Sequence, residues 1–225
     1  MTVDKGDDMT DDAAAGDGVF AQTLDKAEAI VAHEFAQFQL VSNEGGRAAC
    51  QDDWPVFHQM RVSQFLTWTL PMLDSYAADL DAADAAHRNL LTEKYARMMA
   101  STEPERYARE IAPRLPTLSA ERVDAQEHII ETQVAWARAF RDRYQRLGDA
   151  MRLLTTDQDT LADTSFETYL RGELGTYSER TLALYAELVE DAVETDGNLT
   201  TKTIGYTVAL AGFENLEAAE EAQGA

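Results

Sequence analysis

Apolar residues recur every three or four positions along most of this chain, which is the spacing of one face of an α-helix. The first such stripe predicts a helix that begins near Phe20. Its members are Phe20, Leu24, Ala27, Val31, Phe35, Phe38 and Val41. The pair Gly45-Gly46 follows directly and should end this helix, because glycine readily adopts the left-handed conformation found at helix ends.

A second helix should begin at Asp52 or Asp53. Either aspartate can cap it, and Pro55 would then lie in the first turn, where a missing backbone N–H costs nothing. Pro71 falls inside the same stripe and should kink or divide the helix. The apolar face runs through Phe57, Met60, Phe65, Trp68, Met72 and Tyr76.

Capping signals mark the next helices. A third helix lies near residues 90–100, and the sequence Thr102-Glu103-Pro104-Glu105 reads as a capping box that opens a short fourth one. Pro113 and Pro116 should end the fourth helix. Ser119 then opens a long helix, whose apolar residues are Val123, Ile130, Val134, Phe140, Tyr144 and Leu147.

The last third of the chain follows the same pattern. Residues 148–163 are rich in Asp and Thr and predict a loop, after which Thr164-Ser165-Phe166-Glu167 reads as another capping box. That helix should run to about Val193, unless Gly172 and Gly175 break it, and two short helices should close the chain. No segment alternates with period two for long enough to be a strand. We therefore expect residues 19–225 to form a single all-α, bundle-like domain of six to eight helices.

The first eighteen residues have a different composition. They include six Asp and almost nothing apolar, so we expect residues 1–18 to be a disordered acidic tail. The start of the chain has no basic and apolar run of the kind a secretory signal needs. No stretch approaches the ~20 apolar residues of a membrane-spanning helix. These features predict a soluble, cytoplasmic protein.

The charge of the chain restricts its partners. Acidic residues outnumber basic ones by 41 to 19, which gives a formal net charge of −22. Such a field repels nucleic acids and anionic membranes, so we expect neither as a partner. The acidity fits either a partner surface or adaptation to very high salt, where charges are screened within a few ångströms. We favour salt adaptation, because the acids are spread along the chain and lysine is scarce.

Three segments are too polar, aromatic and glycine-rich for ordinary helix surface. We call them islands one, two and three: residues 42–54, 89–99 and 164–173. Each mixes acids, Arg and aromatic residues, from which a buried polar site can be built. The candidate acid/base residues are Glu44, Glu93 and Glu167. The candidate ligand-binding residues are Arg47, Asp53, Trp54, Arg97, Tyr169 and Arg171.

Each candidate also has a structural interpretation. Arg47 follows two glycines and precedes a helix start, which suits an anion site, but it can equally pair with Glu44 or Asp53 in a turn. Glu93 with Arg97, and Glu167 with Arg171, are spaced as i, i+4 pairs. If these faces are buried, the pairs either form a structural polar network or hold a ligand. The residues leave both possibilities open.

The remaining reactive residues give weaker signals. The single cysteine, Cys50, cannot form an internal disulfide, and we expect a small buried core residue rather than a nucleophile. The four His residues lie outside any Glu-x-x-His or His-Glu-x-x-His pattern, so we expect no metal site. The sequence does not indicate a cofactor.

The islands resemble a known family. The runs Asn43 to Arg47, Cys50 to Trp54, Leu91 to Met99 and Thr164 to Leu174, followed by Thr176-Tyr177-Ser178, are similar to a prokaryotic family catalogued as domain of unknown function number 4125. The resemblance covers about residues 25–220 and implies a stand-alone domain of this size, which the acidic composition makes a halophile-like version of the family. It brings no activity, cofactor or catalytic residue. Family members carry a Gly/Arg/Pro-rich segment where this chain has Gly148 to Asp163.

Two functions therefore remain. The first is binding or transforming a small polar or anionic molecule in a central pocket lined by Arg and Glu. The alternative is a non-catalytic, partner-binding helical protein whose polar core is structural. A pocket that joins the islands would favour the first function, and an apolar patch on the outside would favour the second. The residues alone decide neither whether the protein is an enzyme nor its oligomeric state.

Overall fold

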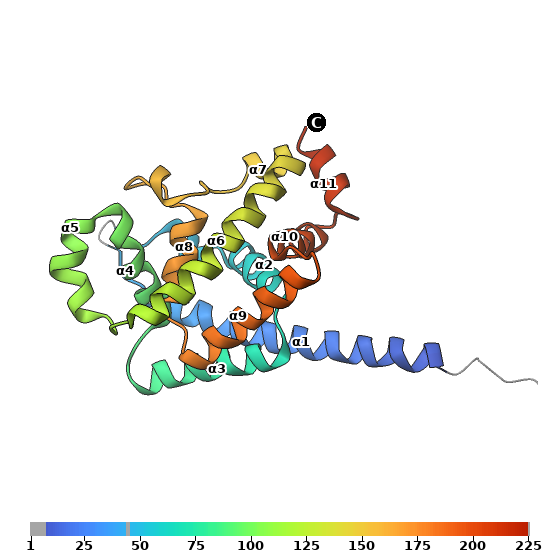
Figure 1. Cartoon of the computed structure of the whole chain (residues 1–225), viewed down its shortest axis with the longest axis horizontal. Helices are drawn as coiled ribbons and strands as arrows, with labels where there is room; N and C mark the ends of the chain where they lie inside the picture. The colour runs from blue at the N-terminus through green and yellow to red at the C-terminus, as the bar shows by residue number, and fades with distance from the viewer. Residues whose placement is uncertain (1–7, 44–45, 225) are drawn as a thin grey trace, which may run out of the picture.

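The computed structural model describes residues 8–43 and 46–224, and within these ranges the chain is all-helical with no strand (Figure 1). The predicted fold class is therefore confirmed. The predicted number of six to eight helices is wrong, because eleven α-helices occur in the described residues. Three of them, α5, α7 and α11, have only 3, 5 and 7 residues, which is too short to show a helical period in the sequence.

The helices follow one another through short turns. Their bounds are α1 Asp8–Gln39, α2 Trp54–Phe65, α3 Leu70–Ala85, α4 Leu90–Thr102, α5 Pro104–Arg106, α6 Ala120–Arg143, α7 Gln145–Asp149, α8 Phe166–Leu174, α9 Glu179–Glu194, α10 Leu199–Leu210 and α11 Leu216–Ala222. Short 3₁₀ turns occur at Ala49–Asp52, Ala112–Arg114 and Thr156–Gln158, and a π-helical turn occurs at Tyr107–Ile111.

Side-chain caps explain where most helices start. In seven of them the residue before the helix accepts a hydrogen bond from the backbone N–H three positions on, which stabilises a helix by about 1 kcal/mol. The capping residues are Asp53, Asn89, Ser119, Ser165, Ser178, Asn198 and Asn215.

Two predicted capping boxes are wrong in detail. The box at Thr102 does not form, because α4 continues through Thr102, and Glu103, which precedes α5, makes no side-chain cap. The box at Thr164 is shifted by one residue. Ser165 is the cap instead, and its Oγ accepts a hydrogen bond from the backbone N–H of Thr168 at 3.2 Å.

Pro71 divides the second predicted helix, as expected. Helix α2 ends at Phe65, and α3 begins at Leu70 with the proline in its first turn. The expectation that Met60 lies on the buried face is wrong, since 54% of this residue is exposed. The inward side of α2 runs through Val62 and Phe65, both 0% exposed, and Met60 lies on the outer side.

The main apolar core lies between α1, α2, α3, α6, α8 and α9. Trp68 is at its centre, with ring centroids 4.8 Å from Phe65, 5.6 Å from Tyr76 and 5.9 Å from Tyr177. These tilted and edge-on contacts are the geometry that aromatic rings prefer. A second cluster joins α6, α7, α10 and α11, and its buried members are Phe140, Tyr144, Leu147, Val208 and Ala219. A third cluster joins Phe38 and Val41, at the end of α1, to Leu91 of α4.

A glycine sets the distance between α4 and α8. A Cβ atom at Gly172 would lie 2.8 Å from the carbonyl oxygen of Lys94 and 2.9 Å from Cγ of Met98. Only glycine therefore lets α8 approach the backbone of α4 this closely. Islands two and three, on these two helices, face each other as a result.

The predicted tail falls partly outside the described residues. Nothing is described for residues 1–7, and α1 already includes residues 8–18. Disorder over residues 1–18 therefore stays a prediction. In the described part of the chain, no helix is both long and apolar enough to cross a membrane.

The close approach of α4 and α8 can be tested with a glycine pair. We expect Gly172→Ala to lower the free energy of unfolding by about 1–3 kcal/mol, because the new methyl group meets the α4 backbone. The control is Gly205→Ala in α10, where a Cβ meets nothing within 4 Å. There we expect a gain of about 0.5–1 kcal/mol. Chemical denaturation measures both, and equal effects would show that α8 does not need a glycine.

Candidate functional site

Four charged residues meet in the interior where α1, α2, α4 and α8 converge. Arg61 donates hydrogen bonds to both carboxylate oxygens of Glu34, each at 2.6 Å, and its Nη1 donates to Glu173 at 3.1 and 3.2 Å. Lys94 Nζ donates to the other side of Glu173 at 2.5 Å. We call Glu34, Arg61, Lys94 and Glu173 the ion network. It holds two carboxylates and two cations, so its charges balance.

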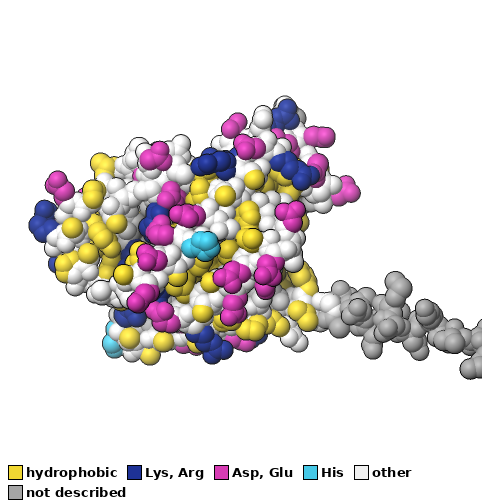
Figure 2. All heavy atoms as spheres, in the orientation of Figure 1, with side chains coloured by type: hydrophobic (Ala, Val, Ile, Leu, Met, Phe, Trp, Pro, Cys, Tyr) yellow, Lys and Arg dark blue, Asp and Glu magenta, His cyan; other side chains and the backbone are white. Residues whose placement is uncertain are grey.

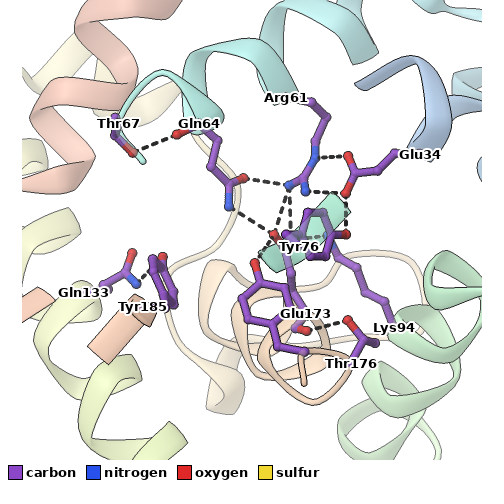
Figure 3. Close-up of polar contacts among 11 residues, drawn as sticks. Glu34, Arg61, Gln64, Thr67, Tyr76, Lys94, Gln133, Glu173, Thr176 and Tyr185 are labelled. Atoms are coloured by element: carbon purple, nitrogen blue, oxygen red, sulfur yellow. Dashed lines mark hydrogen bonds and ion pairs between the residues drawn. The ribbon is translucent and has the colours of Figure 1, made fainter. Parts of the chain in front are cut away.

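Neutral side chains complete the ion network (Figure 3). Tyr76 donates from its hydroxyl to Glu34 at 2.6 Å, and Tyr177 donates to Glu173 at 2.9 Å. Gln64 bridges the two halves, accepting from Arg61 at 2.6 Å and donating to Glu173 at 3.0 Å. Every charge is thus paired within the chain, and the network needs no ligand to be stable.

The ion network also fixes protonation states. Burial pushes the pKa of Glu173 upward, but Arg61 and Lys94 outweigh burial and hold this pKa well below the ordinary value. Burial and the charge of Glu34 raise the pKa of Tyr76 well above its ordinary value. The carboxylate stays ionised and the tyrosine stays neutral near neutral pH. Groups held so firmly in one state are poor proton carriers.

Two members of the ion network were missed in the sequence. Glu34 lies on the inward line of α1 with Val31 and Phe38, and Arg61 lies one turn from both Phe57 and Phe65. A charge inside an otherwise apolar stripe is the signal that could have found them. Their partner Glu173 is far away in the chain, so the pairing itself left no local pattern.

Island one covers the end of α1 and stays apart from the ion network. Arg47 donates to Asp52 at 3.0 and 2.8 Å on the surface, so it forms a turn pair with Asp52 rather than with the expected Glu44 or Asp53. Asp53 caps α2 by accepting from the backbone N–H of Val56 at 3.2 Å. Trp54 packs edge-on against Phe35 with ring centroids 4.9 Å apart. Glu44 lies outside the described residues.

The buried residue of island one is Gln51, which is 0% exposed. Its side-chain amide donates to the carbonyl oxygens of Phe38 and Val41 at 2.8 and 3.0 Å. The expectation of a buried Cys50 is wrong, because this cysteine is exposed. Gln51 takes the inward position of the 3₁₀ turn and leaves its neighbour outside. Island one therefore serves the local fold.

Island two splits its charges between different partners. Lys94 belongs to the ion network, while Glu93 accepts two hydrogen bonds from Arg88, both at 2.7 Å. Arg97 has no carboxylate partner in the described part of the chain. Its Nη2 donates to the carbonyl oxygen of Pro116 at 2.8 Å, and its buried Nε has no hydrogen-bond partner.

Arg171 of island three is held by hydrogen bonds to α6, α8 and the loop before α8. Arg171 donates to both oxygens of Glu127 and to Glu167, each at 2.7 Å, and to the hydroxyl of Thr156 at 2.9 Å. Burial raises the pKa of Glu167, but Arg171 and the backbone N–H of Thr156 lower it more, so it lies below the ordinary value. Tyr169 lies under Arg152, whose guanidinium carbon is 3.6 Å from the ring centroid.

A cavity of about 150 Å³ lies where islands two and three meet. Its lining residues are Arg97, Met98, Ala100, Ser101, Thr156, Thr168, Arg171 and Gly172. Two of the candidate ligand-binding residues, Arg97 and Arg171, thus share one cavity. Arg47, Asp53 and Trp54 lie elsewhere, and neither Glu93 nor Glu167 lines it. We call this space the α4–α8 cavity.

A loop segment closes one side of the α4–α8 cavity. Asp159 accepts hydrogen bonds from Ser101 of α4 and Thr168 of α8, both at 2.5 Å, and from the backbone N–H of Ser165 at 2.7 Å. These bonds fasten the loop that carries Thr156 to both helices. The wall of the cavity is therefore firmly held.

Burial and charge together act on Arg97. Burial lowers the pKa of its guanidinium, and the nearby cations Arg122 and Arg88 lower it further. Tyr107 and Glu93 act in the opposite direction but do not cancel this effect. A cation whose charged form is disfavoured in this way gains free energy from an added anion. Among the described residues, no group of three His, Cys, Asp or Glu side chains could hold a metal ion.

These features define an all-helical domain with a closed ion network and a small arginine-lined cavity beside it. The chain belongs to the family described as "Protein of unknown function (DUF4125)", which matches residues 25–221 and confirms the resemblance drawn from the islands. No curated protein matches the chain. No solved structure matches it either.

The ion network makes a prediction about acid stability. Because the folded-state pKa of Glu173 is lowered, its contribution is complete above the unfolded-state pKa of about 4.3 and is lost as the pH falls below it. We expect Glu173→Gln to cost about 3 kcal/mol at neutral pH, since the buried Lys94 then loses its carboxylate partner while Arg61 keeps Glu34. The difference from wild type should shrink as the pH falls through that window.

Chemical denaturation at a series of pH values measures this difference. Glu131→Gln is the control, because Glu131 lies on the exposed surface of α6 and should follow the wild type. Stability curves of wild type and Glu173→Gln that stay parallel down to acidic pH would contradict the assignment of Glu173 as the ionised centre of the network.

Proposed function

We propose that the protein binds a small anionic molecule in the α4–α8 cavity, with Arg97 as the cation that holds it. The main support for this proposal is that Arg97 lines the cavity and has no carboxylate partner in the described part of the chain. A partly buried cation without a counter-ion is costly, and a bound anion would remove that cost.

The other arginines do not compete for this role. Arg171 lines the same cavity, but Glu127 and Glu167 already neutralise it. Arg47 pairs with Asp52 on the surface. The hydroxyls of Ser101, Thr156 and Thr168 in the wall can donate to or accept from the ligand's polar atoms. The volume suits phosphate, sulfate or a short carboxylate, because one water already takes up about 30 Å³ of liquid.

The proposal is binding rather than a reaction. Glu93 and Glu167 accept hydrogen bonds from Arg88 and Arg171, so neither carboxylate is free to act as a base. An acid/base role for Glu44, Glu93 or Glu167 stays a prediction. In this proposal the ion network is structural. The alternative of a partner-binding helical protein also has a structural polar core.

We expect Arg97→Met to abolish anion binding while preserving the fold, because methionine keeps the aliphatic contact and removes the charge. The measurement is isothermal titration with phosphate, sulfate and acetate, together with native mass spectrometry of freshly purified protein. At least one of these anions should bind to wild type. Failure of all three to bind, with no retained small molecule, would contradict the proposal.

Two variants serve as controls for Arg97→Met. Arg138→Met removes the same charge from the exposed surface of α6, and it should bind the anion like wild type. Arg171→Met leaves Glu127 and Glu167 without their cation, so it should lower the melting temperature. A comparable loss of binding in Arg138→Met would show that net charge, and not the cavity, attracts the anion.

We also infer that the protein is salt-adapted and works in a salt-rich cytoplasm. The formal net charge of −22 supports this inference, and so do the Asp and Glu side chains scattered over the face shown in Figure 2. At low ionic strength these charges repel one another and oppose the compact state.

The melting temperature should therefore rise as KCl increases into the molar range, where the Debye length falls to about 3 Å. Thermal melts across a KCl series measure this. A series in sodium sulfate separates screening from the general stabilising effect of excluded salts. A melting temperature that stays flat or falls with KCl would refute salt adaptation.

A further inference from the structure

A second hollow lies between α2 and α10 and shares no residue with the α4–α8 cavity. Its volume is about 490 Å³, and its lining residues are Leu66, Thr67, Lys202, Gly205, Tyr206 and Ala209. Gln59 of α2 joins the two helices by donating to the carbonyl oxygen of Thr207 at 2.8 Å. We call this hollow the α2–α10 groove. Its size is within the range of sites that hold another molecule.

Both helices that border the α2–α10 groove carry exposed apolar residues. Val56 and Met60 are one turn apart on α2 and are 52% and 54% exposed, and Leu210 at the end of α10 is 49% exposed. Single exposed apolar residues need no explanation, but several on the two helices that border an open groove suit a docking surface.

The floor of the groove leaves room for another helix to approach the backbone of α10. Gly205 lies inside α10, where glycine costs about 1 kcal/mol relative to alanine. A Cβ there would meet nothing within 4 Å, so the chain's own packing does not require this glycine. Ala209 follows one turn later. Two small residues on one helix face allow another helix to lie close to the backbone.

The charge of the groove is unusual for this chain. Lys202 is exposed one turn before Gly205 and makes no ion pair with any described residue, and no carboxylate lines the groove. The chain as a whole has 41 acids against 19 bases. An apolar groove that carries the ammonium group of Lys202 therefore suits an amphipathic helix with acidic residues.

The N-terminal end of α1 is such a helix. Val19 and Phe20 are 53% and 48% exposed there, and this end extends beyond the other helices (Figure 1). A Cβ at Gly16 or Gly18 would meet nothing within 4 Å, so the chain does not pack against this end. Six Asp occur in residues 1–18. The segment is thus acidic in sequence, and its described residues Gly16, Gly18, Val19 and Phe20 are exposed.

The direction of α1 keeps its N-terminal end away from the groove of its own chain. Helix α1 runs parallel to α3, since Lys26 pairs with Asp74 and His33 pairs with Asp84. Both pairs lie on the C-terminal side of Phe20 along α1. From there α1 continues straight and leads away from its own body (Figure 1). The N-terminal end can therefore cover a groove only in a second copy.

We propose that two copies of this chain form a dimer in which the N-terminal end of α1 from each copy lies in the α2–α10 groove of the other. The exchange is reciprocal, as a two-fold axis requires. It covers the apolar residues of both surfaces and brings the acidic segment to Lys202. The proposal does not depend on the anion site, so Arg97→Met should remain dimeric.

Sedimentation velocity over a range of protein concentrations in high KCl tests this proposal. We expect wild type to be a dimer, and Phe20→Asp near the N-terminal end of α1 and Ala209→Asp in the groove each to weaken it ~10-fold or more. Both residues are exposed, so these variants should fold, which circular dichroism verifies. The control is Leu161→Asp, which changes an 81% exposed leucine in the loop before α8 and should stay dimeric. A monomeric wild type, or equal weakening by Leu161→Asp, would overturn the proposal.

A cross-link tests which surfaces meet. In a Cys50→Ser background, protein with Phe20→Cys is mixed with protein carrying Ala209→Cys, and a disulfide-linked heterodimer should form under mild oxidation. Replacing the second protein by one with Leu161→Cys should give none. A wild-type dimer without the expected cross-link, and unaffected by Phe20→Asp, would mean that another face pairs the copies. A third protein carries both Phe20→Cys and Ala209→Cys in one chain. If its disulfide forms only within that chain, exchange between copies is refuted.

Discussion

The pairing of Arg61 with two carboxylates from distant helices is the interaction on which this structure depends. Glu34 lies in α1 and Glu173 in α8, and the single guanidinium between them joins both to α2. Lys94 adds α4 through the free side of Glu173. Buried charges are expensive unless they are paired. The four helices can therefore pack only in the arrangement that closes all of these ion pairs, which makes the network a constraint on the fold as much as a source of stability.

The α4–α8 cavity is a consequence of that constraint. Lys94 reaches Glu173 only if the two helices are close, and Gly172 removes the side chain that would keep them apart. Arg97 is one turn further along α4, where Gly175 lets its side chain cross α8. Glu173 is already saturated by Arg61, Lys94, Gln64 and Tyr177 and has no capacity left for Arg97. The carboxylate of Glu93, which acts on Arg97 from the same helix, is taken by Arg88, so the guanidinium of Arg97 is left beside the cavity.

The sequence predicts the helices well and the site only in part. Periodicity and caps locate the long helices because those signals are local, and islands two and three do meet. The pairing of Arg61 with Glu173 joins residues 112 positions apart, and no local pattern records it. Glu34 and Arg61 looked like ordinary charged residues because each is alone in its stripe. Met60 was assigned to the core because the break at Pro71 changes which face of α2 turns inward, and a single apolar stripe cannot show this.

Arg97 has no carboxylate partner among the described residues, and the composition of the chain makes this informative. With 41 acids against 19 bases, a carboxylate partner for a cation is easy to supply, and Arg88, Arg122 and Arg171 each have at least one. Lys94 lies three residues before Arg97 and is neutralised by the ion network, so it adds no free charge to the cavity. A ligand there would meet one available positive charge, with hydroxyls around it and a firmly held wall. That combination favours a small anion over a polyanion, because each further negative charge would be buried without a cation to balance it.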